Sequence, residues 1–307
     1  MSEPMTVFDR RAVRLHRDRA ARTLGEHDFL FRESAARLVD RLDDIVRQFP
    51  QVLDLGCHSG EMSHILDARS GIETLVQCDL SARMAASAGG LSVAADEELL
   101  PFADGAFDLI ISNLSLHWVN DLPGALIQAR RALKPDGLFL AAMLGGHTLT
   151  ELRQSLMEAE TKVEGGFSPR VSPFVDVRDG GDLLQRAGFA LPVADADVIS
   201  VSYTDPFRLL ADLRGMGETN AVFERRKGAT RRATLMAAAE AYRNNFGGPD
   251  GRLPATFEVI YLTAWAPHPS QQKPLRPGSA RSRLSDALDT TEIPAGDHAD
   301  PDPEGRK

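Results

Sequence analysis

The sequence predicts a doubly wound α/β protein, in which a mainly parallel sheet carries helices on both faces. The first observation is the segment VLDLGCHSG at 52–60, where apolar residues are followed by a turn with two glycines and then by helix-forming residues. The second is that further apolar runs of strand length follow at 74–79, 107–113 and 138–143. Because helix-forming segments separate these runs, we expect the strands to be parallel.

The glycine turn at the end of the first predicted strand indicates a nucleoside-type cofactor. Gly56 and Gly60 permit a tight turn and a close approach of the backbone to a ligand. A dinucleotide fingerprint would need glycines at the positions of His58 and Glu61, so that fingerprint is absent. The alternative interpretation is an ordinary turn after a core strand.

Acidic residues follow the second and third predicted strands. A carboxylate at Asp79 can accept hydrogen bonds from both hydroxyls of a ribose. The other interpretation of Asp79 is a helix N-cap, a role that Ser81 could also take. Asp96 follows the third strand, near residues 93–95, and suits an adenine amino group, with Glu97 as the second candidate.

The fourth predicted strand ends at Asn113 and is followed by Ser-Leu-His-Trp at 115–118. Ligands in doubly wound sheets bind outside the carboxyl ends of the strands. His117 is therefore the candidate catalytic base, because imidazole titrates near neutral pH. The alternative is a structural histidine packed beside Trp118. A helix at 125–133 then stops at the turn Lys-Pro-Asp-Gly before the fifth strand.

These landmarks together resemble the class I S-adenosylmethionine-dependent methyltransferases. The resemblance rests on the pattern Asp-x-Gly-x-x-x-Gly that starts at Asp54, on the acids after strands two and three, and on Leu-Lys-Pro-Asp-Gly at 133–137. It implies a Rossmann-like seven-stranded sheet with an antiparallel last strand, and S-adenosyl-L-methionine as the cofactor. The cofactor-binding residues that follow are Asp54, Gly56, Cys57, His58, Gly60, Asp79, Leu80, Asp96, Glu97 and Asn113.

A closer resemblance, over roughly residues 6 to 279, is to the mitochondrial complex I assembly factors of methyltransferase fold, the type assigned to arginine hydroxylation. It is carried by the segments 8–10, 95–98, 114–121, 165–174 and 216–220. A more distant one is to the malonyl-carrier-protein methyltransferases of biotin synthesis, which share the Ser-x-Leu-x-x-Trp element but not the C-terminal motifs.

Three functions remain open at this point. The main hypothesis is an S-adenosylmethionine-dependent methyltransferase that acts on a protein or small-molecule acceptor. The alternatives are a protein-arginine hydroxylase with a complex I subunit as its client, and a non-catalytic assembly chaperone. For the hydroxylase, no triad of two histidines and one carboxylate can be assigned, and we predict no metal ligands. Cys57, His58 and Cys78 lack the spacing of a metal motif.

His58 stands where the methyltransferase family usually has a glycine. If this position needs a positive φ, a non-glycine residue costs about 1–3 kcal/mol, although histidine adopts that region more readily than most residues. The alternative is a negative φ with the side chain pointing outward. A second departure is His147, where an acid would suit the assembly-factor pattern.

Composition and pattern predict one domain with additions at both ends. We expect an N-terminal helical cap at 1–48, a methyltransferase-like domain at 49–266, and a Pro/Ser/Asp-rich tail at 267–307 that is disordered from about 280. A helical insertion before the last strand, at about 206–246, would cover the cofactor crevice. No apolar stretch is long enough to cross a bilayer, and no targeting segment is apparent.

The charge pattern restricts the partners. A net charge of -9 argues against a nucleic-acid partner, because phosphate contacts need a broad basic surface. One basic cluster lies at 225–232 and is interpreted as a solvated helix face or, less favoured, a docking patch. With only two cysteines, Cys57 and Cys78, we expect a cytoplasmic protein, peripheral to the inner membrane only through a client.

Overall fold

The chain divides into two compact units, residues 1–268 and residues 269–307. A seven-stranded sheet forms the centre of the first unit. The computed structural model describes residues 6–66, 71–272, 279 and 283–291. The strand order is β3-β2-β1-β4-β5-β7-β6. The first five strands pair in parallel, whereas β7 runs antiparallel to both β5 and β6, which confirms the predicted sheet and its last strand. The strands are β1 (Gln51–Leu55), β2 (Thr74–Asp79), β3 (Leu91–Ala94), β4 (Phe107–Asn113), β5 (Leu133–Leu144), β6 (Ala190–Tyr203) and β7 (Leu253–Trp265).

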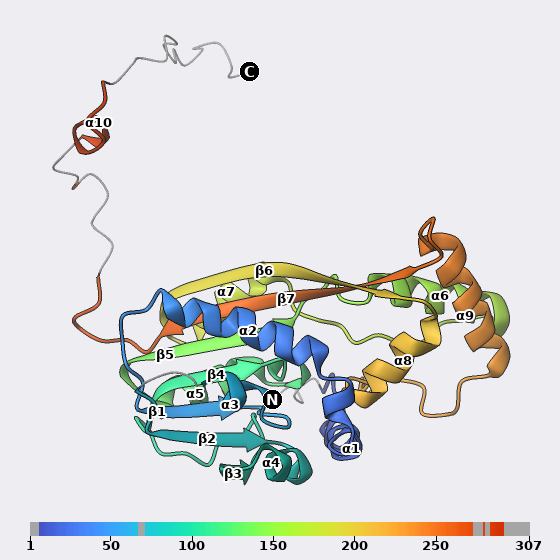
Figure 1. Ribbon diagram of the computed structural model, residues 1–307, viewed down its shortest axis with the longest axis horizontal. Coiled ribbons are helices and arrows are strands. Elements are labelled where there is room, and N and C mark those ends of the chain that lie inside the picture. The colour runs from blue at the N-terminus through green and yellow to red at the C-terminus, as the bar shows by residue number, and fades with distance from the viewer. Residues whose placement is uncertain (1–5, 67–70, 273–278, 280–282, 292–307) are drawn as a thin grey trace, which may run out of the picture. The chain divides into compact units, whose positions relative to one another are not determined.

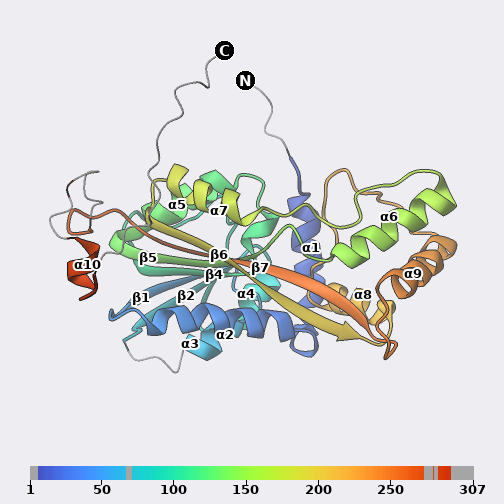
Figure 2. The same cartoon turned by 90° about the horizontal axis from the view of Figure 1, so that it is seen from above.

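Helices cover both faces of the sheet, with α2 and α3 on one side and α5 and α7 on the other (Figure 2). The helices and helical turns of the described residues are α1 (Arg10–Ala20), η1 (Leu24–Glu26), α2 (Phe29–Asp43), α3 (Glu61–Leu66), α4 (Ala82–Ala88), η2 (Leu116–Trp118), α5 (Leu122–Ala132), α6 (Thr150–Glu164), α7 (Val177–Arg186), α8 (Pro206–Gly215), α9 (Arg232–Phe246) and α10 (Leu284–Ala287).

The central strand β5 shows how the sequence divides the core between the two faces. Leu138, Leu140 and Ala142 belong to the apolar cluster that includes α2, whereas Phe139 and Ala141 belong to the cluster of α5 and α7. Successive side chains of a strand point to opposite faces, so a strand that is covered on both sides reads as a continuous apolar run. The apolar run at 138–143 shows this pattern.

Local signals in the sequence set several helix ends. Ser81 caps α4 by accepting a hydrogen bond from the backbone N–H of Met84 at 3.1 Å. Asp121 caps α5 in the same way through Gly124, at 2.9 Å. After α7, Gly188 adopts a φ of +82°, the left-handed conformation that glycine tolerates best, and the chain turns into β6.

The helices around residues 206–246 are arranged differently from our expectation. Helix α1, rather than α8 or α9, lies directly beyond the carboxyl ends of β1 and β2, and α9 packs along α6 (Figure 1). Of the basic cluster at 225–232, only Arg232 lies in a helix, as the first residue of α9, so the interpretation of this cluster as a helix face is wrong. The glycine at 228 and the polar run around it favour a loop there.

The C-terminal unit contains α10 within its described residues. The predicted disorder from about residue 280 falls largely on 280–282 and 292–307, which lie outside the described part of the chain. Among the described helices, none combines the length and the apolar character that a bilayer span requires.

Candidate functional site

The glycine loop after β1 bends the chain back toward β2. Gly56 and Gly60 have φ angles of +77° and +95°, conformations that other residues rarely adopt. The backbone N–H groups of Gly56 and Cys57 donate to the carbonyl of Cys78 at 2.7 and 2.9 Å. A Cβ atom at Gly56 would overlap the side chain of Ser115, so only glycine permits this packing.

His58 lies in the loop with a φ of +48°, so the strained conformation that we considered is the one present. The outward-pointing alternative is wrong, because the side chain is buried and its ring lies 4.4 Å from that of Phe31. Its Nε2 donates toward the carbonyls of Asn113 and Leu114, at 3.1 and 3.2 Å. Burial, and then the charge of Arg17, lower the pKa of His58 to about 4, so the ring is neutral at physiological pH.

Asp54, the acid of the loop motif, is buried at the end of β1 with no hydrogen-bond partner among the described residues. Burial raises its pKa well above the ordinary value, and the charges of Glu61 and Asp79 raise it further. A buried carboxylate without a donor is costly, and an ammonium group would relieve that cost. The amino group of S-adenosylmethionine has this character, so the residue suits the cofactor.

Asp79 is fully buried at the carboxyl end of β2. One carboxylate oxygen accepts the backbone N–H of Ser81 at 2.7 Å, and the other accepts that of His58 at 3.2 Å. The helix-cap interpretation of Asp79 is not what the structure shows, since Ser81 caps α4. Burial raises the pKa of Asp79, partly offset by the charge of Arg17.

Glu97 is the more deeply placed of the two adenine candidates. It is fully buried and accepts from the Ser115 hydroxyl at 2.6 Å, whereas the side chain of Asp96 is 34% exposed. Burial would raise the pKa of Glu97, but the charges of Arg17 and Arg10 lower it to about 2. Arg10 also contacts Asp96, at 2.5 Å. The sequence favours Asp96 for the adenine contact, whereas in the structure arginines of α1 engage both acids.

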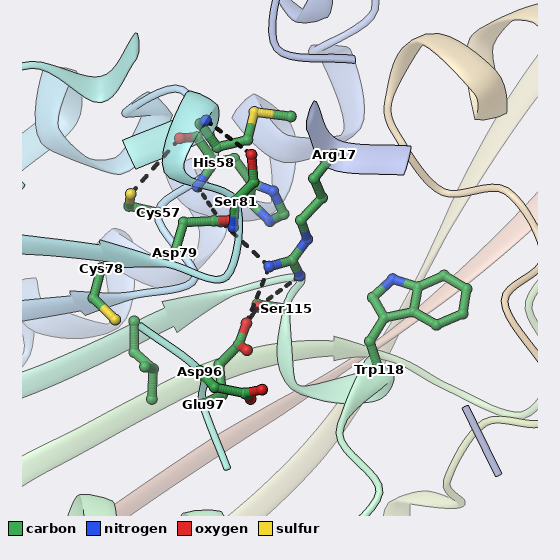
Figure 3. Close-up of polar contacts among 12 residues, drawn as sticks. Arg17, Cys57, His58, Cys78, Asp79, Ser81, Asp96, Glu97, Ser115 and Trp118 are labelled. Carbon is green, nitrogen blue, oxygen red and sulfur yellow. Dashed lines mark hydrogen bonds and ion pairs between the residues drawn. The ribbon is translucent and has the colours of Figure 1, made fainter. Parts of the chain in front are cut away.

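Arg17 is the site residue that sequence reasoning missed. Its side chain is 1% exposed and points from α1 toward Asp79, Glu97 and Ser115 (Figure 3). Its nitrogens lie 3.3 Å from the Asp79 carboxylate, 3.0 Å from that of Glu97 and 2.8 Å from the Ser115 hydroxyl. Asp18 adds a contact from the same helix to the Ser81 hydroxyl, at 2.5 Å. Helix α1 therefore docks on the very acids that the sequence assigns to the cofactor.

His117 lies in the helical turn η2 after β4, and its Nε2 is 3.0 Å from a carboxylate oxygen of Glu218. The same carboxylate accepts the indole N–H of Trp118 at 2.9 Å. Burial would raise the pKa of Glu218, but the charge and hydrogen bond of His117 lower it. The other ring nitrogen of His117, Nδ1, is buried without a partner in the described part of the chain. Glu218 was not among the predicted site residues, although it belongs to the segment Met-Gly-Glu-Thr-Asn that carries the closer resemblance.

The remaining predicted residues have mainly structural contacts. Asn113 donates from its side-chain amide to the carbonyl of Phe31 at 2.9 Å, and Leu80 is half-buried beside the apolar cluster around Trp118. Cys57 and Cys78 are free, buried thiols whose pKa values burial raises. Within the described ranges, no three or more His, Cys, Asp or Glu side chains gather in a way that could hold a metal ion.

The two segments outside the cofactor fold that carry the closer resemblance lie against each other. The side-chain amide of Asn220 donates to the carbonyl of Pro169 at 2.7 Å. Phe174, from the first segment, packs edge-on against His117 with ring centres 5.6 Å apart. We call residues 167–174 and 216–220 together the lip. Its inner side thus touches the candidate base.

Comparisons with known proteins agree with this geometry. The family described as a methyltransferase domain matches residues 53–141. The chain is 43% identical to the arginine hydroxylase NDUFAF5, mitochondrial, of Danio rerio over 92% of its own length and 89% of that protein. It is 46% identical to the human protein of the same name, over 90% of this chain and 81% of the relative. The chain belongs to the NDUFAF5 family of methyltransferase-fold proteins.

The NDUFAF5-family chain has further relatives among methyltransferases. It is 37% identical, over 93% of its length and 99% of the relative, to the malonyl-[acyl-carrier protein] O-methyltransferase of a Methylovorus strain. A candidate methyltransferase of Bacillus halodurans has the same fold, with a TM-score of 0.54 at 16% identity over 77% of this chain and all of that one. The phosphoethanolamine N-methyltransferase 2 of Haemonchus contortus, solved with S-adenosylhomocysteine, gives 0.51 at 16% identity over 83% of this chain and 60% of that one.

These comparisons settle the class of the protein and its cofactor. By fold and family it belongs to the S-adenosylmethionine-dependent methyltransferases, whose cofactor is S-adenosyl-L-methionine, and the reaction type is left open. They also correct one expectation. Relatives that are 37–46% identical are named as mitochondrial proteins, so the expectation of a cytoplasmic location is wrong.

Proposed function

We propose that this NDUFAF5-family protein transfers the methyl group of S-adenosylmethionine to a nucleophile of a protein acceptor, with His117 as the base. The observation that carries the proposal is the pairing of His117 with Glu218 at the carboxyl end of β4. When Nε2–H donates to Glu218, the neutral ring keeps its lone pair on Nδ1, the nitrogen that has no partner in the described residues. A carboxylate that orients a histidine in this way is the usual support of a general base.

The cofactor would be held by residues on three strand ends. The glycine loop allows its close approach, the Asp54 carboxylate would accept from its amino group, and Asp79 and Glu97 would face its nucleoside part. When bound, the cofactor supplies an activated methyl group on a sulfonium sulfur. The protein then has to align the acceptor with that methyl group and take up the acceptor's proton.

The step at the base is a proton transfer. As the acceptor nucleophile takes the methyl group that the bound cofactor would supply, it would give up its proton to Nδ1 of His117. The Glu218 carboxylate stabilises the imidazolium that results, since the opposite charge lies 3.0 Å away.

Arginine hydroxylation is the second candidate, and the relatives favour it. Proteins named arginine hydroxylase are 43% and 46% identical over at least 90% of this chain, more than the malonyl-carrier-protein methyltransferase at 37%. The Glu218 carboxylate, which belongs to the lip, is a suitable partner for a guanidinium. Hydroxylation inserts one oxygen atom of dioxygen and needs two electrons from an external reductant. For both candidate reactions, we propose that the protein client is a subunit of respiratory complex I.

Mass spectrometry of complex I subunits from cells with and without this protein distinguishes the proposals. A gain of one methylene unit on a client residue supports methyl transfer, and a gain of one oxygen atom on an arginine supports hydroxylation instead. Identical masses in both strains would overturn both proposals and favour an assembly chaperone.

Substitution of the base tests the mechanism directly. His117→Gln should abolish methylation of the client while the affinity for S-adenosylhomocysteine, measured by calorimetry, stays within about twofold. If His117→Gln keeps full activity, His117 is a structural residue and the mechanism is wrong. Loss of cofactor affinity would place His117 in the cofactor pocket.

A further inference from the structure

A cavity of about 650 Å³ lies behind the lip, between α6, α8 and the segment 216–230. This volume falls in the usual range for sites that bind small organic molecules. Its interior wall is apolar and is built from residues of several elements. Buried members include Leu144, Leu149, Leu152, Leu156, Leu213 and Phe257.

The rim of the cavity carries an excess of positive charge. The cationic side chains that line it are Arg19, Arg170, Arg214, Arg225, Arg226 and Lys227. Some of these are already paired, since Arg170 contacts Glu160, Arg225 contacts Asp9 and Arg226 contacts Glu164.

The other rim cations lack a carboxylate partner among the described residues. Arg19 contacts only the hydroxyl of Thr219, at 3.1 Å, and Lys227 lies over the ring of Phe223 at 5.1 Å. Arg214 has no ion pair in the described part of the chain. Arg19 and Arg214 are close enough to affect each other, because burial and then the charge of Arg214 lower the pKa of Arg19.

The one carboxylate in the wall of the cavity does not compensate these charges. Glu218 is already engaged by the ring of His117 and the indole of Trp118. Arg19 and Arg214 therefore line the mouth of an apolar chamber without a carboxylate partner in the described part of the chain. An anionic head group there would form charge-assisted hydrogen bonds with them.

We propose that this cavity binds a single-chain amphiphile with an anionic head group, with the alkyl chain among the leucines and the head group at Arg19 and Arg214. The proposal goes beyond methyl transfer, because neither the cofactor nor the base takes part in the binding. The cavity shares Trp118 and Glu218 with the wall of the candidate active site, so a ligand there would lie next to the acceptor.

Calorimetric titration of the full chain with dodecanoate tests the proposal. Dodecyl phosphate is the second probe, and it distinguishes a carboxylate from a phosphate head group. Dodecanol keeps the chain and removes the charge, while butanoate keeps the charge and shortens the chain. We expect dodecanoate or dodecyl phosphate to bind at least about tenfold more tightly than either control, since both chain burial and ion pairing contribute. Equal binding of dodecanol, or no binding of either anionic probe, would overturn the proposal.

Two variants place the ligand in this cavity. The double variant Arg19→Gln/Arg214→Gln should bind the anionic probe about tenfold or more weakly. Arg208→Gln is the matched control, because Arg208 is exposed on the same helix α8 and does not line the cavity. Leu210→Trp, at the half-buried wall, should block the chain and weaken binding without removing a charge.

The affinity of each variant for S-adenosylhomocysteine serves as the readout that separates this proposal from the proposed function. It should not change, because the acids of the cofactor crevice are intact. If Arg208→Gln weakens binding as much as the double variant does, the probe binds to general surface charge and the proposal is wrong. Failure of methyl transfer in cells would leave these titrations unaffected.

Discussion

Arg17 and Asp79 form a buried ion pair, with 3.3 Å between the guanidinium Nη1 and the carboxylate Oδ2, at the position that doubly wound enzymes use for a ribose. The same guanidinium contacts Glu97 at 3.0 Å, so one arginine engages two of the acids that we assign to the cofactor. Ribose hydroxyls and the guanidinium need the same lone pairs of Asp79. Cofactor binding is therefore expected to compete with the docking of α1.

Arg17→Gln should tighten cofactor binding and destabilise the free protein. The variant removes the competing donor but leaves the buried Asp79 carboxylate without its counter-charge and Glu97 with Arg10 alone, which costs about 3–5 kcal/mol in comparable buried pairs. Calorimetry with S-adenosylhomocysteine should show about tenfold higher affinity, and urea unfolding without ligand should show the lower stability.

Arg14→Gln is the control for Arg17→Gln, because Arg14 is exposed on the same helix. It should change neither quantity. If Arg17→Gln instead weakens the affinity while the protein stays folded, Arg17 is a ligand of the cofactor and the competition does not exist.

Asp79→Asn should weaken S-adenosylhomocysteine binding by about 1.5–3 kcal/mol, the difference made by a charged hydrogen-bond acceptor. Asparagine keeps the shape of the side chain, but its single oxygen can accept only one of the two backbone N–H groups, those of Ser81 and His58, so urea unfolding of the variant is the control for stability. The measurement is a calorimetric titration at fixed pH and salt. An unchanged dissociation constant would remove Asp79 from the ribose site.

The pH dependence of stability should report on His58. In an unfolded chain its pKa is near the ordinary 6.5, and in the folded protein burial and Arg17 lower the pKa to about 4. Below pH 6.5 the unfolded state therefore takes up a proton that the folded state does not. The contribution of this residue is complete above about pH 6.5 and decreases as the pH falls to about 4, by about 3 kcal/mol in total.

His58→Asn isolates this effect, because asparagine also accepts a positive φ but does not titrate. Urea unfolding of both proteins between pH 4 and 7 should give a wild-type stability that falls more steeply toward low pH. Glu97 does not interfere, since its pKa is lowered from 4.5 to about 2 and its contribution is lost only in that lower range. Parallel pH profiles would show that folding does not lower the pKa of His58, and the prediction would be wrong.

The sequence predicted the sheet well because its strands carry strong local signals. Runs such as that at 138–143 are apolar on both faces, and Gly188 and Ser81 mark helix ends by their own chemistry. The conformation of His58 could also be considered in advance, since the family pattern needs a glycine there. In each case the cause lies within a few residues of the effect.

Arg17 could not be predicted because its role depends on residues that are far away in the chain. It contacts Asp79, Glu97 and Ser115, and nothing in the arginine-rich segment around it separates it from its exposed neighbours Arg11 and Arg14. The cluster at 225–231 was misinterpreted for a related reason. Basic residues are compatible with a helix face or a loop, and Arg225 and Arg226 pair with Asp9 and Glu164, which lie far away in the chain.

The outer side of the lip supports the last prediction, which concerns client docking. Phe167 is 73% exposed although it is a large apolar residue, whereas Phe174 of the same segment packs against His117. An exposed aromatic residue next to a candidate active site is a typical anchor for a protein partner. Phe167→Ala should therefore reduce client modification about tenfold or more and leave the affinity for S-adenosylhomocysteine within about twofold.

Val193→Ala is the matched control for Phe167→Ala, because Val193 is a comparably exposed apolar residue, 55% exposed, on the edge strand β6. Modification of the client, measured by mass spectrometry in cells that carry each variant, should be lost only for Phe167. Phe174→Ala should lower both modification and stability, since it also removes the ring that packs on His117. If Phe167→Ala modifies its client as well as the wild type does, the lip is not the docking surface, and the client must reach His117 from another side.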